Sequence, residues 1–238
     1  MQIAIIGYGK MGREIEAAAL KKGYGIVLKA DKDNTEQLNS EILGRADVAL
    51  EFTTPDTAED NIIACFNAGV PVVCGTTGWT GRLPEIECLC REKNQALFYS
   101  SNFSIGVNIM FRLNRWLAGV MNRFPAYDAE IEEIHHIHKK DSPSGTAITL
   151  AEDMLKELER KTGWINDHTQ SPELLPVISE RTGEVPGTHT ITYRSHSDVL
   201  EIRHRALSRS VFATGAVIAA EFIRGKTGVF KMEDLLKI

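Results

Sequence analysis

The stretch IAIIGYGKMGREI, residues 3–15, decides the fold expected for the first half of this chain. A short apolar run ends at Gly7, and glycines then recur in the spacing Gly7-x-Gly9-x-x-Gly12. Apolar residues with helical spacing follow until Gly23, which suits the end of a helix. The sequence therefore predicts a strand, a tight glycine turn and a helix in immediate succession.

An acidic residue completes this pattern at the end of the next expected strand. Asp31 lies about 20 residues beyond Gly12, where dinucleotide-binding units place the acid that accepts hydrogen bonds from ribose hydroxyls. Gly7 allows the turn, Gly9 lets the backbone approach a pyrophosphate, and Gly12 lets the helix pack on the strand. Free N–H groups at the helix start favour phosphate. The alternative is a glycine turn that serves packing alone.

The residue after this acid bears on the choice of cofactor. Asp31 by itself favours NADH, whereas Lys32 can pair with the 2′-phosphate of NADPH. A solvated surface lysine is the competing interpretation of Lys32. We expect both NADH and NADPH to be used.

Strand and helix patterns alternate up to about residue 103, which predicts a parallel, doubly wound sheet. The turns FTTP, residues 52–55, and CGTTG, residues 74–78, both follow expected strands. Both should therefore lie at the carboxyl edge of the sheet, where ligands bind in such folds. Gly75 and Thr77 can offer backbone and hydroxyl groups to the nicotinamide ribose. Ordinary strand-to-helix turns are the alternative.

The pattern changes after residue 103. A long helix, an alternating strand, a helix over 146–161 and an irregular stretch over 163–187 are expected in that order. The runs GTHTITYRS and VLEIRHRAL alternate with period two and predict an antiparallel pair. An apolar helix, VFATGAVIAAEFI, and a short polar tail end the sequence.

These patterns predict an α/β protein with two domains. The first is a Rossmann-like dinucleotide-binding domain, residues 1–103, completed by residues 209–238. The second is an α+β substrate and oligomerisation domain, residues 104–208, with an open mixed sheet. An open sheet edge is also a natural interface between subunits.

Composition excludes several classes of function. The chain has 238 residues and a net charge of −5, without a polybasic run, so nucleic acid and membrane surfaces are not expected partners. The N-terminus lacks the features of a signal peptide, and no apolar run approaches the length of a membrane span. The four cysteines lie in expected core segments and are interpreted as reduced thiols of a cytoplasmic protein.

Cationic and titratable residues gather in HHIHKKDSPSGTA, residues 135–147. Ser142 or Ser144 can cap the helix that follows. The backbone N–H groups of Ser144, Gly145 and Thr146 are then expected to point outward as an anion site. With the preceding histidines and lysines, such a site suits a substrate with more than one carboxylate. We expect the strand to end near His136.

Histidine can give or take a proton near neutral pH, and lysine supplies charge and a second proton. The combination favours reduction of an unsaturated carboxylate. A metal cluster is disfavoured because the adjacent lysines would repel a divalent cation, and a solvated cationic loop remains the bland alternative. The other histidines show no cluster and are interpreted as surface or hairpin residues: His168, His189, His196 and His204.

At these residues the sequence resembles the 4-hydroxy-tetrahydrodipicolinate reductases (dihydrodipicolinate reductases) of bacterial lysine and diaminopimelate biosynthesis. HHIHKKDSPSGTA resembles the signature of that family. CGTTG, SSNFSIGVN and the C-terminal SRSVFATGAVIAAEFIRGKTGVFKMEDLL resemble further segments of it in the same order. The first glycine turn is one residue shorter than the form often found in the family.

The resemblance implies a role for each matching residue. His135 would be the catalytic proton donor and acceptor, and Lys139 the catalytic proton donor. Substrate binding is implied for His136, Ser144, Gly145 and Thr146. Cofactor binding is implied for Gly7, Tyr8, Gly9, Lys10, Met11, Gly12, Asp31, Lys32, Gly75, Thr76, Thr77, Ser100, Ser101, Asn102 and Phe103. A small dicarboxylate substrate, a homotetramer and no metal are also implied, and Asp141 is expected to orient the loop lysines.

Two other hypotheses fit the same fold class. One is another small NAD(P)-dependent reductase, such as an aspartate dehydrogenase-like enzyme, against which the histidine–lysine loop argues. The other is a non-catalytic nucleotide sensor, which would bind NAD(H) yet tolerate loss of His135 and Lys139.

Overall fold

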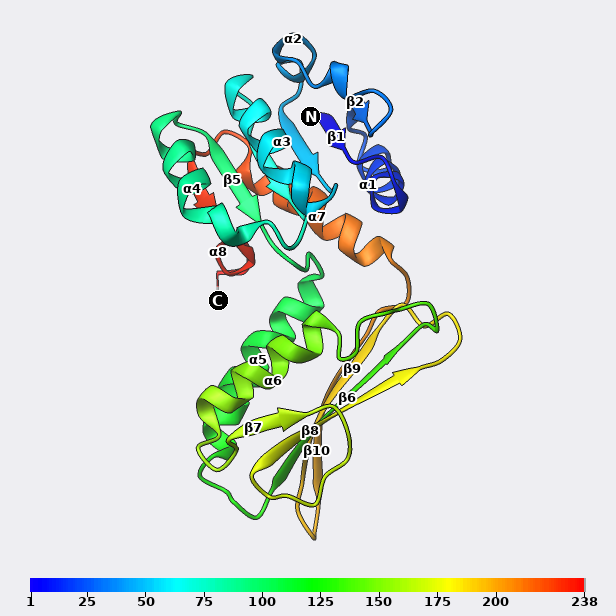
Figure 1. Ribbon diagram of the computed structural model, residues 1–238, viewed down its shortest axis with the longest axis vertical. Coiled ribbons are helices and arrows are strands. Elements are labelled where there is room, and N and C mark those ends of the chain that lie inside the picture. The colour runs from blue at the N-terminus through cyan, green and yellow to red at the C-terminus, as the bar shows by residue number, and fades with distance from the viewer. Residues whose placement is uncertain (238) are drawn as a thin grey trace. The chain divides into compact units, whose positions relative to one another are not determined.

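A computed structural model describes residues 1–237, which form two compact units (Figure 1). Unit 1 comprises Met1–Ile105 and the chain from Ser210 onward, and unit 2 comprises Gly106–Arg209. The predicted class is confirmed, because one sheet is wholly parallel and the other is mixed.

Unit 1 is built on a six-stranded parallel sheet in the order β11-β5-β4-β3-β1-β2. Its strands are β1 (Gln2–Ile6), β2 (Gly25–Ala30), β3 (Val48–Glu51), β4 (Val72–Cys74), β5 (Ala96–Tyr99) and β11 (Gly228–Phe230). Its helices are α1 (Lys10–Lys21), α2 (Ser40–Leu43), α3 (Pro55–Asn67), α4 (Leu83–Glu92), α7 (Ser210–Ile223) and α8 (Met232–Leu236). Short 3-10 turns lie at η1 (Thr35–Gln37) and η2 (Thr80–Arg82).

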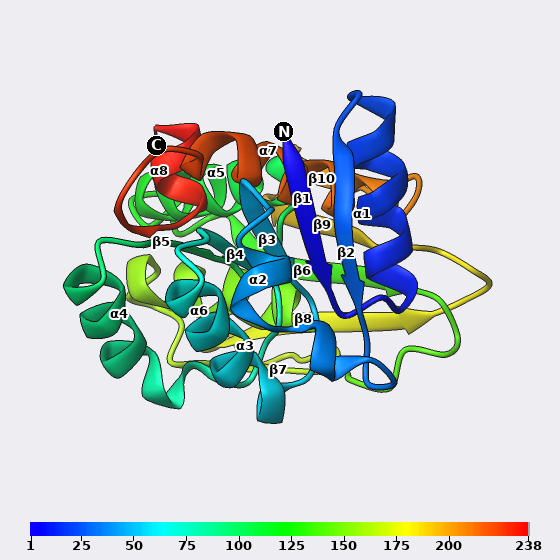
Figure 2. The ribbon, with the colours of Figure 1, turned by 90° about the horizontal axis from the view of Figure 1, so that it is seen from above.

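The central strands of unit 1 are continuous apolar runs because both faces of the sheet are covered. Ile3 and Ile5 of β1 point into a core shared with α1, α7 and α8. Ala4 and Ile6 point into the opposite core, which α2, α3 and α4 complete. Figure 2 shows α7 and α8 on the other side of this sheet from α3 and α4.

The C-terminal residues differ from the expected polar tail. β11 pairs in parallel with β5 and adds an edge strand to the sheet, and Met232 of α8 is buried. Gly228–Phe230 has only three residues and shows no period in the sequence, so its pattern does not predict a strand.

Unit 2 packs two helices, α5 (Ile105–Met121) and α6 (Gly145–Glu157), on one face of a five-stranded sheet in the order β10-β9-β6-β8-β7. The strands are β6 (Asp128–His135), β7 (Gly163–Ile165), β8 (Leu174–Arg181), β9 (Thr188–Arg194) and β10 (Val199–Arg205). β6 pairs in parallel with β8 and antiparallel with β9. The antiparallel pair β9–β10 is confirmed.

Two predictions for unit 2 were wrong. The stretch 163–187 is not irregular, because it contains β7 and β8. Pro176 and the glycines around these strands resemble loop punctuation, yet Pro176 sits in β8 and Leu175 and Val177 beside it are core residues. Helix α6 also ends at Glu157, earlier than the predicted 161.

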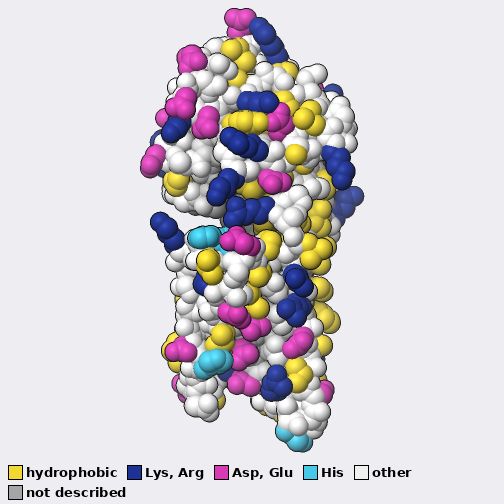
Figure 3. Space-filling view, turned by 90° about the vertical axis from the view of Figure 1, so that its right-hand side faces the viewer, with side chains coloured by type: hydrophobic (Ala, Val, Ile, Leu, Met, Phe, Trp, Pro, Cys, Tyr) yellow, Lys and Arg dark blue, Asp and Glu magenta, His cyan; other side chains and the backbone are white. Residues whose placement is uncertain are grey.

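Surface charge agrees with the composition. On the face drawn in Figure 3, basic, acidic and hydrophobic side chains are interspersed within each unit. Among the helices of residues 1–237, none combines the length and apolar character needed to cross a membrane. All four cysteines are free thiols.

Candidate active site

The glycine turn of unit 1 has the geometry that its sequence predicts. Gly7 has φ +95°, and a Cβ there would lie 2.0 Å from the carbonyl oxygen of Phe52. A Cβ at Gly12 would lie 2.4 Å from the oxygen of Gly7. Gly9, the N-cap of α1, has no described heavy atom within 4 Å of its Cβ position. Gly7 and Gly12 are therefore needed for packing, and Gly9 leaves room for a ligand.

A cavity of about 330 Å³ opens beside this turn. Its lining residues come from the carboxyl ends of β1, β2 and β3 and from α3: Ile6, Gly7, Gly9, Ala30, Asp31, Lys32, Thr35, Leu38, Phe52, Thr53, Thr54, Thr57 and Asn61. The Asp31 carboxylate accepts from the backbone N–H of Lys32 at 2.9 Å. An acid beside an apolar cavity, with open backbone at Gly9, fits the adenosine half of a nicotinamide dinucleotide.

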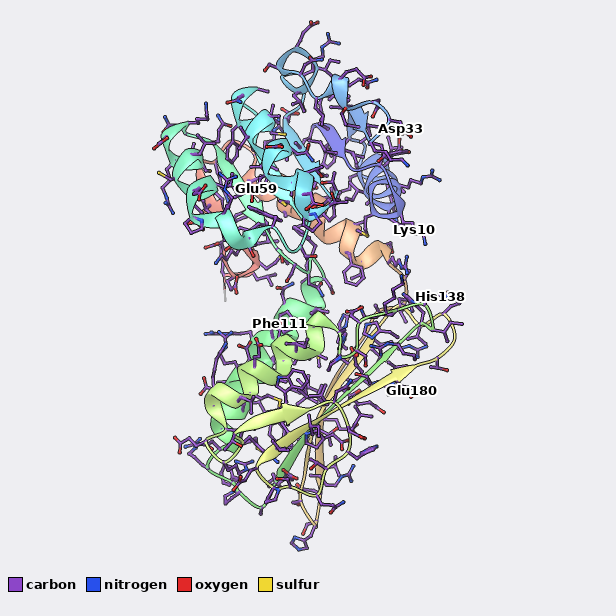
Figure 4. All side chains as sticks on the ribbon, viewed as in Figure 1. Lys10, Asp33, Glu59, Phe111, His138 and Glu180 are labelled. Atoms are coloured by element: carbon purple, nitrogen blue, oxygen red, sulfur yellow. The ribbon has the colours of Figure 1, made fainter. Side chains whose placement is uncertain are left out.

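None of the other residues expected at the cofactor is among the described residues that line this cavity. Gly75 must remain glycine, because a Cβ would lie 2.0 Å from the Phe52 ring. Thr76 is largely buried, and its Oγ1 accepts from the backbone N–H of Thr53 at 2.8 Å. The exposed residues of this set are Tyr8 (in part), Lys10, Thr77 and Ser101. Figure 4 labels Lys10 at the start of α1.

The segment after β5 is tied together internally. Ser100 Oγ donates to the carbonyl oxygen of Asn102 at 2.8 Å, and Asn102 Oδ1 accepts from the Ser104 N–H at 2.9 Å. Phe103 is buried against the rings of Phe52 and Phe98. Phe103 therefore shapes this site by packing. Met11 packs against the same core and Gly12 is buried, so neither lines the cavity.

A buried polar cluster that no sequence motif indicated adjoins this cavity through Thr53 and Asn61. Glu51, the last residue of β3, is fully buried and accepts from Asn61 Nδ2 at 3.3 Å and Cys74 Sγ at 3.1 Å. Thr53 Oγ1 also donates to it. Burial and this carboxylate raise the pKa of the Cys74 thiol, which keeps it protonated. The only sequence signal was an acid ending an apolar run.

In unit 2, β6 ends at His135, and the cationic loop begins at His136 as expected. Lys139 Nζ donates to both carboxylate oxygens of Asp141 at 2.8 Å, which is the orienting contact expected of that acid. Burial opposes ionisation of Asp141, but Lys139 outweighs it and the pKa of Asp141 is lowered.

The other loop histidines contact charged neighbours. Burial and the charge of Arg209 lower the pKa of His136, whose Nε2 lies 3.1 Å from the Arg209 guanidinium. His138 lies 3.6 Å from Glu184 and is exposed. Figure 4 labels His138 in this loop and Glu180 on the neighbouring strand β8.

Helix α6 begins where the sequence predicts, with one difference at its cap. Ser144 is the N-cap, and its Oγ accepts from the backbone N–H of Ala147 at 3.2 Å. The N–H of Ser144 does not point outward, because it donates to the buried Glu133 carboxylate at 2.9 Å. Gly145 has no described heavy atom within 4 Å of its Cβ position, and Thr146 follows it in the first turn. The open part of the helix start therefore begins at Gly145.

Glu133 is a candidate functional residue that no sequence motif indicated. It is 0% exposed, and its Oε1 accepts from the Ser144 N–H at 2.9 Å, Ser179 Oγ at 2.9 Å and Arg181 Nη2 at 2.8 Å. Its Oε2 lies 3.3 Å from His135 Nδ1 and 3.6 Å from His189 Nε2. Burial would raise the pKa of Glu133, but these donors together outweigh it, so the pKa lies far below its usual range. Alternation gave the only hint, since Glu133 falls on the inward side of β6.

The interpretation of His189 as a bland hairpin residue was wrong. It is 4% exposed, its ring packs edge-on against that of His135, and its Nε2 lies 3.2 Å from Ser144 Oγ. Burial lowers the pKa of His189, although Glu133 opposes that shift. The pairing register of β9 with β6 places His189 opposite Glu133, which a single strand pattern cannot reveal.

Glu133, His135 and His189 bring three groups of metal-ligand type within 4.8 Å of one another. Oε1 of Glu133, however, accepts hydrogen bonds from the Arg181 guanidinium and the Ser144 N–H. A nearby guanidinium opposes a divalent cation, so the cluster fits a hydrogen-bonded ionic network better than a metal centre.

Comparisons with known proteins agree with both halves of the chain. The family model for the dihydrodipicolinate reductase N-terminus matches residues 1–103, and the model for the C-terminus matches residues 106–236. The chain is 46% identical to the 4-hydroxy-tetrahydrodipicolinate reductase of Christiangramia forsetii, over 99% of this chain and 98% of that protein. It is 34% identical to the enzyme of that name from Neisseria meningitidis serogroup B, over 93% of this chain and 83% of that protein.

Solved structures agree in fold. The dipicolinate-bound dihydrodipicolinate reductase of Paenisporosarcina sp. TG-14 matches with a TM-score of 0.79 and 24% identity, over 97% of both chains. A probable dehydrogenase from Thermotoga maritima matches with a TM-score of 0.55 and 11% identity, over 99% of this chain and 92% of that one. Matching family models along nearly the whole chain, with a 46% identical relative of similar length, show that this protein is an oxidoreductase belonging to the dihydrodipicolinate reductase family.

Proposed function

We propose that this enzyme reduces 4-hydroxy-tetrahydrodipicolinate, or the dihydrodipicolinate derived from it, to tetrahydrodipicolinate in lysine and diaminopimelate biosynthesis. NADH or NADPH is the reductant. The observation that carries the proposal is the loop after β6, in a chain of this family: it joins His135 and Lys139 to the open start of α6.

Unit 1 is proposed to hold the cofactor. The open backbone at Gly9 and the N–H groups at the start of α1 suit the pyrophosphate, and the Asp31 carboxylate suits the adenosine ribose. Lys32 lines the same cavity and can meet a 2′-phosphate, which supports use of both cofactors. When bound, the cofactor supplies a hydride. The residues of the CGTTG turn and Ser100 to Phe103 are assigned to its nicotinamide end.

Unit 2 is proposed to hold the substrate and manage the proton. The N–H groups of Gly145 and Thr146, at the start of a 13-residue helix, suit a carboxylate, and His136 is a further binding residue. Ser144 supports this helix start as its buried N-cap. His135 and Lys139 provide the proton that accompanies hydride transfer. Dipicolinate, which the Paenisporosarcina reductase binds, carries two carboxylates on a planar ring. A cationic loop beside a helix start suits that chemistry.

The proposed assembly is a cytoplasmic homotetramer built on the sheet of unit 2. Every second residue of β9, such as Thr190 and Thr192, lies on the face of this sheet opposite α5 and α6. In the sheet register these residues have partners on β6 and β10. Sedimentation equilibrium should give four times the 26.4 kDa chain mass. A monomer at micromolar concentration would contradict this part of the proposal.

The activity is tested by adding the enzyme to freshly made product of the dihydrodipicolinate synthase reaction with NADH, and separately with NADPH. Loss of reduced-cofactor absorbance that requires the synthase product is expected. Protein that binds NADH but oxidises neither cofactor would reject the reductase and favour the sensor hypothesis. The ratio of the two rates shows whether the site at Asp31 and Lys32 prefers a ribose without the 2′-phosphate, as in NADH, or with it, as in NADPH.

A further inference from the structure

The buried carboxylate of Glu133 touches both parts of the proposed proton and substrate machinery of unit 2. It lies two residues before His135 on β6, so the two side chains fall on the same face of the strand. Through Oε1 it accepts the Ser144 N–H at the cap of α6. Through Oε2 it faces Nδ1 of His135 at 3.3 Å. One side chain thus links the end of β6 to the start of α6.

The environment of Glu133 keeps it ionised although it is 0% exposed. Arg181 of β8 donates to Oε1 at 2.8 Å, and the same guanidinium donates to the backbone oxygen of Asp141 in the cationic loop at 2.6 Å. Ser179 of β8 donates to the same oxygen. With Oε1 occupied by three donors, Oε2 is left for the imidazoles.

The two nitrogens of His135 have different surroundings. Nδ1 is buried and lies 3.3 Å from Oε2 of Glu133, an ion-pair distance, and it makes no hydrogen bond with another described residue. Nε2 lies beside Gly187, where a Cβ would come within 3.0 Å of it. A carboxylate that faces Nδ1 favours the tautomer with a proton on Nδ1 and stabilises the imidazolium. Glycine at position 187 keeps the space beside Nε2 free of a side chain.

We propose that Glu133 is a positioning residue that holds His135 through Nδ1, so that Nε2 is the nitrogen that exchanges a proton with substrate. The inference rests on the proposed function and deepens it. The imidazolium gives its Nε2 proton to the substrate and becomes the neutral Nδ1–H tautomer, which the carboxylate stabilises. Solvent then returns a proton to Nε2.

Other charged and titratable groups act on the same rings. They come from every element packed around the pair: His136, Lys139 and Asp141 of the loop, Arg181 of β8, His189 of β9 and His204 of β10. A pH profile therefore reports the whole cluster, and the test needs a second readout that belongs to His135 alone.

The deciding variant is Glu133→Gln, which keeps the shape of the side chain. With its amide oxygen in the place of Oε1, the amide NH₂ faces Nδ1 and forces that nitrogen to accept. The neutral ring then carries its proton on Nε2, and the imidazolium loses its counter-charge. We expect kcat to fall about 100-fold and its pH profile to move to lower pH, with the KM for the synthase product changed less than threefold. Nitrogen-15 NMR should show His135 changing from the Nδ1–H to the Nε2–H tautomer.

Asp153→Asn is the matched control, because Asp153 is also a buried carboxylate of unit 2, paired with Arg115 at 2.9 Å on α5. We expect it to keep the kcat, the pH profile and the Nδ1–H tautomer of the wild type. A Glu133→Gln enzyme with wild-type pH profile and tautomer would overturn the inference. If that variant fails to fold, an Nε2–H tautomer of neutral His135 in the wild type would overturn it as well. Wild-type enzyme inactive on the synthase product would instead reject the proposed function.

Discussion

At the scale of single residues, Asp31 is the side chain proposed to bind the adenosine ribose of the cofactor. Its carboxylate lines the cavity and, when it accepts from ribose hydroxyls, favours NADH over a 2′-phosphate of like charge. We predict that Asp31→Asn raises the Kd for NADH about tenfold and leaves the Kd for NADPH unchanged or lower. Fluorescence titration measures both.

The neighbouring Asp33 provides the control for this change. It is an exposed acid on the same turn but does not line the cavity (Figure 4). Asp33→Asn should keep both dissociation constants within twofold. Equal weakening of NADH by the two variants would mean that charge near the turn, rather than a contact from Asp31, sets the affinity.

Gly187 gives a second prediction at this scale. A methyl group there would lie 3.0 Å from Nε2 and 3.3 Å from Cδ2 of His135, and φ is +155°. We predict that Gly187→Ala lowers kcat by about 100-fold, because the ring must move away from its position. Steady-state kinetics checks this.

Gly183→Ala separates crowding from backbone strain. Gly183 has φ +52°, but no described heavy atom lies within 4 Å of its Cβ position. Alanine there should cost about 1 kcal/mol of stability and leave kcat unchanged. A similar loss of kcat in both variants would show that strain in the β8–β9 connection, and not contact with His135, impairs the enzyme.

The residues that the sequence could reveal are those that carry a local pattern. Gly7, Gly12 and Asp31 follow a spacing that physical requirements impose on one short stretch. Glu133 and His189 carry no such pattern, because they meet only through the pairing of β6 with β9. Buried partners of this kind depend on register, which a single sequence does not give.

At the scale of elements, the return of α7 to unit 1 depends on a close approach of backbones. A Cβ at Gly215 would lie 1.8 Å from the carbonyl oxygen of Phe103, which cannot move aside as a flexible side chain would. We predict that Gly215→Ala lowers the free energy of unfolding by about 3 kcal/mol, measured by urea unfolding.

Gly81→Ala is the control within the same unit. Gly81 lies in η2, and no described heavy atom is within 4 Å of its Cβ position. Its substitution should change stability by less than about 0.5 kcal/mol. Comparable effects of the two variants would argue that α7 does not depend on this contact.

Elements with a clear period or a buried apolar run were predictable, whereas β7, β8 and β11 were not. Helix α1 and strand β6 show their period over 12 and 8 residues, respectively. β7 and β11 have three residues each and are defined by the strand they join, β8 or β5. Tertiary pairing, rather than local propensity, makes them strands.

At the scale of the whole molecule, the ionic cluster of unit 2 should set the stability in acid. The folded-state pKa values of Glu133 and His189 are both below their usual values, so each contributes stability that is present above the unfolded pKa and lost as pH falls below it. The unfolded values are about 4.3 and 6.5. The free energy of unfolding should therefore begin to fall near pH 6.5 and fall more steeply below about pH 5.

Urea unfolding at several pH values tests this expectation. Glu133→Gln should lower the free energy by about 2 kcal/mol at pH 7 and remove the steep part below pH 5. Asp60→Asn, at an exposed carboxylate of α3, should leave the curve unchanged. If the free energy of unfolding of Glu133→Gln still fell steeply below about pH 5, the acid-sensitive groups would be others than Glu133.

The central claim is that the loop after β6 carries out the chemistry while unit 1 binds the cofactor. Its most direct test is kcat of Lys139→Ala on the synthase product, with the Kd for NADH measured on the same preparation. Lys156→Ala serves as control, because Lys156 is likewise paired with an aspartate, at 3.0 Å, but lies on α6 away from the loop. The account predicts a fall in kcat of at least 100-fold for Lys139→Ala, with NADH affinity intact, and no change for Lys156→Ala. Undiminished turnover in Lys139→Ala would contradict it.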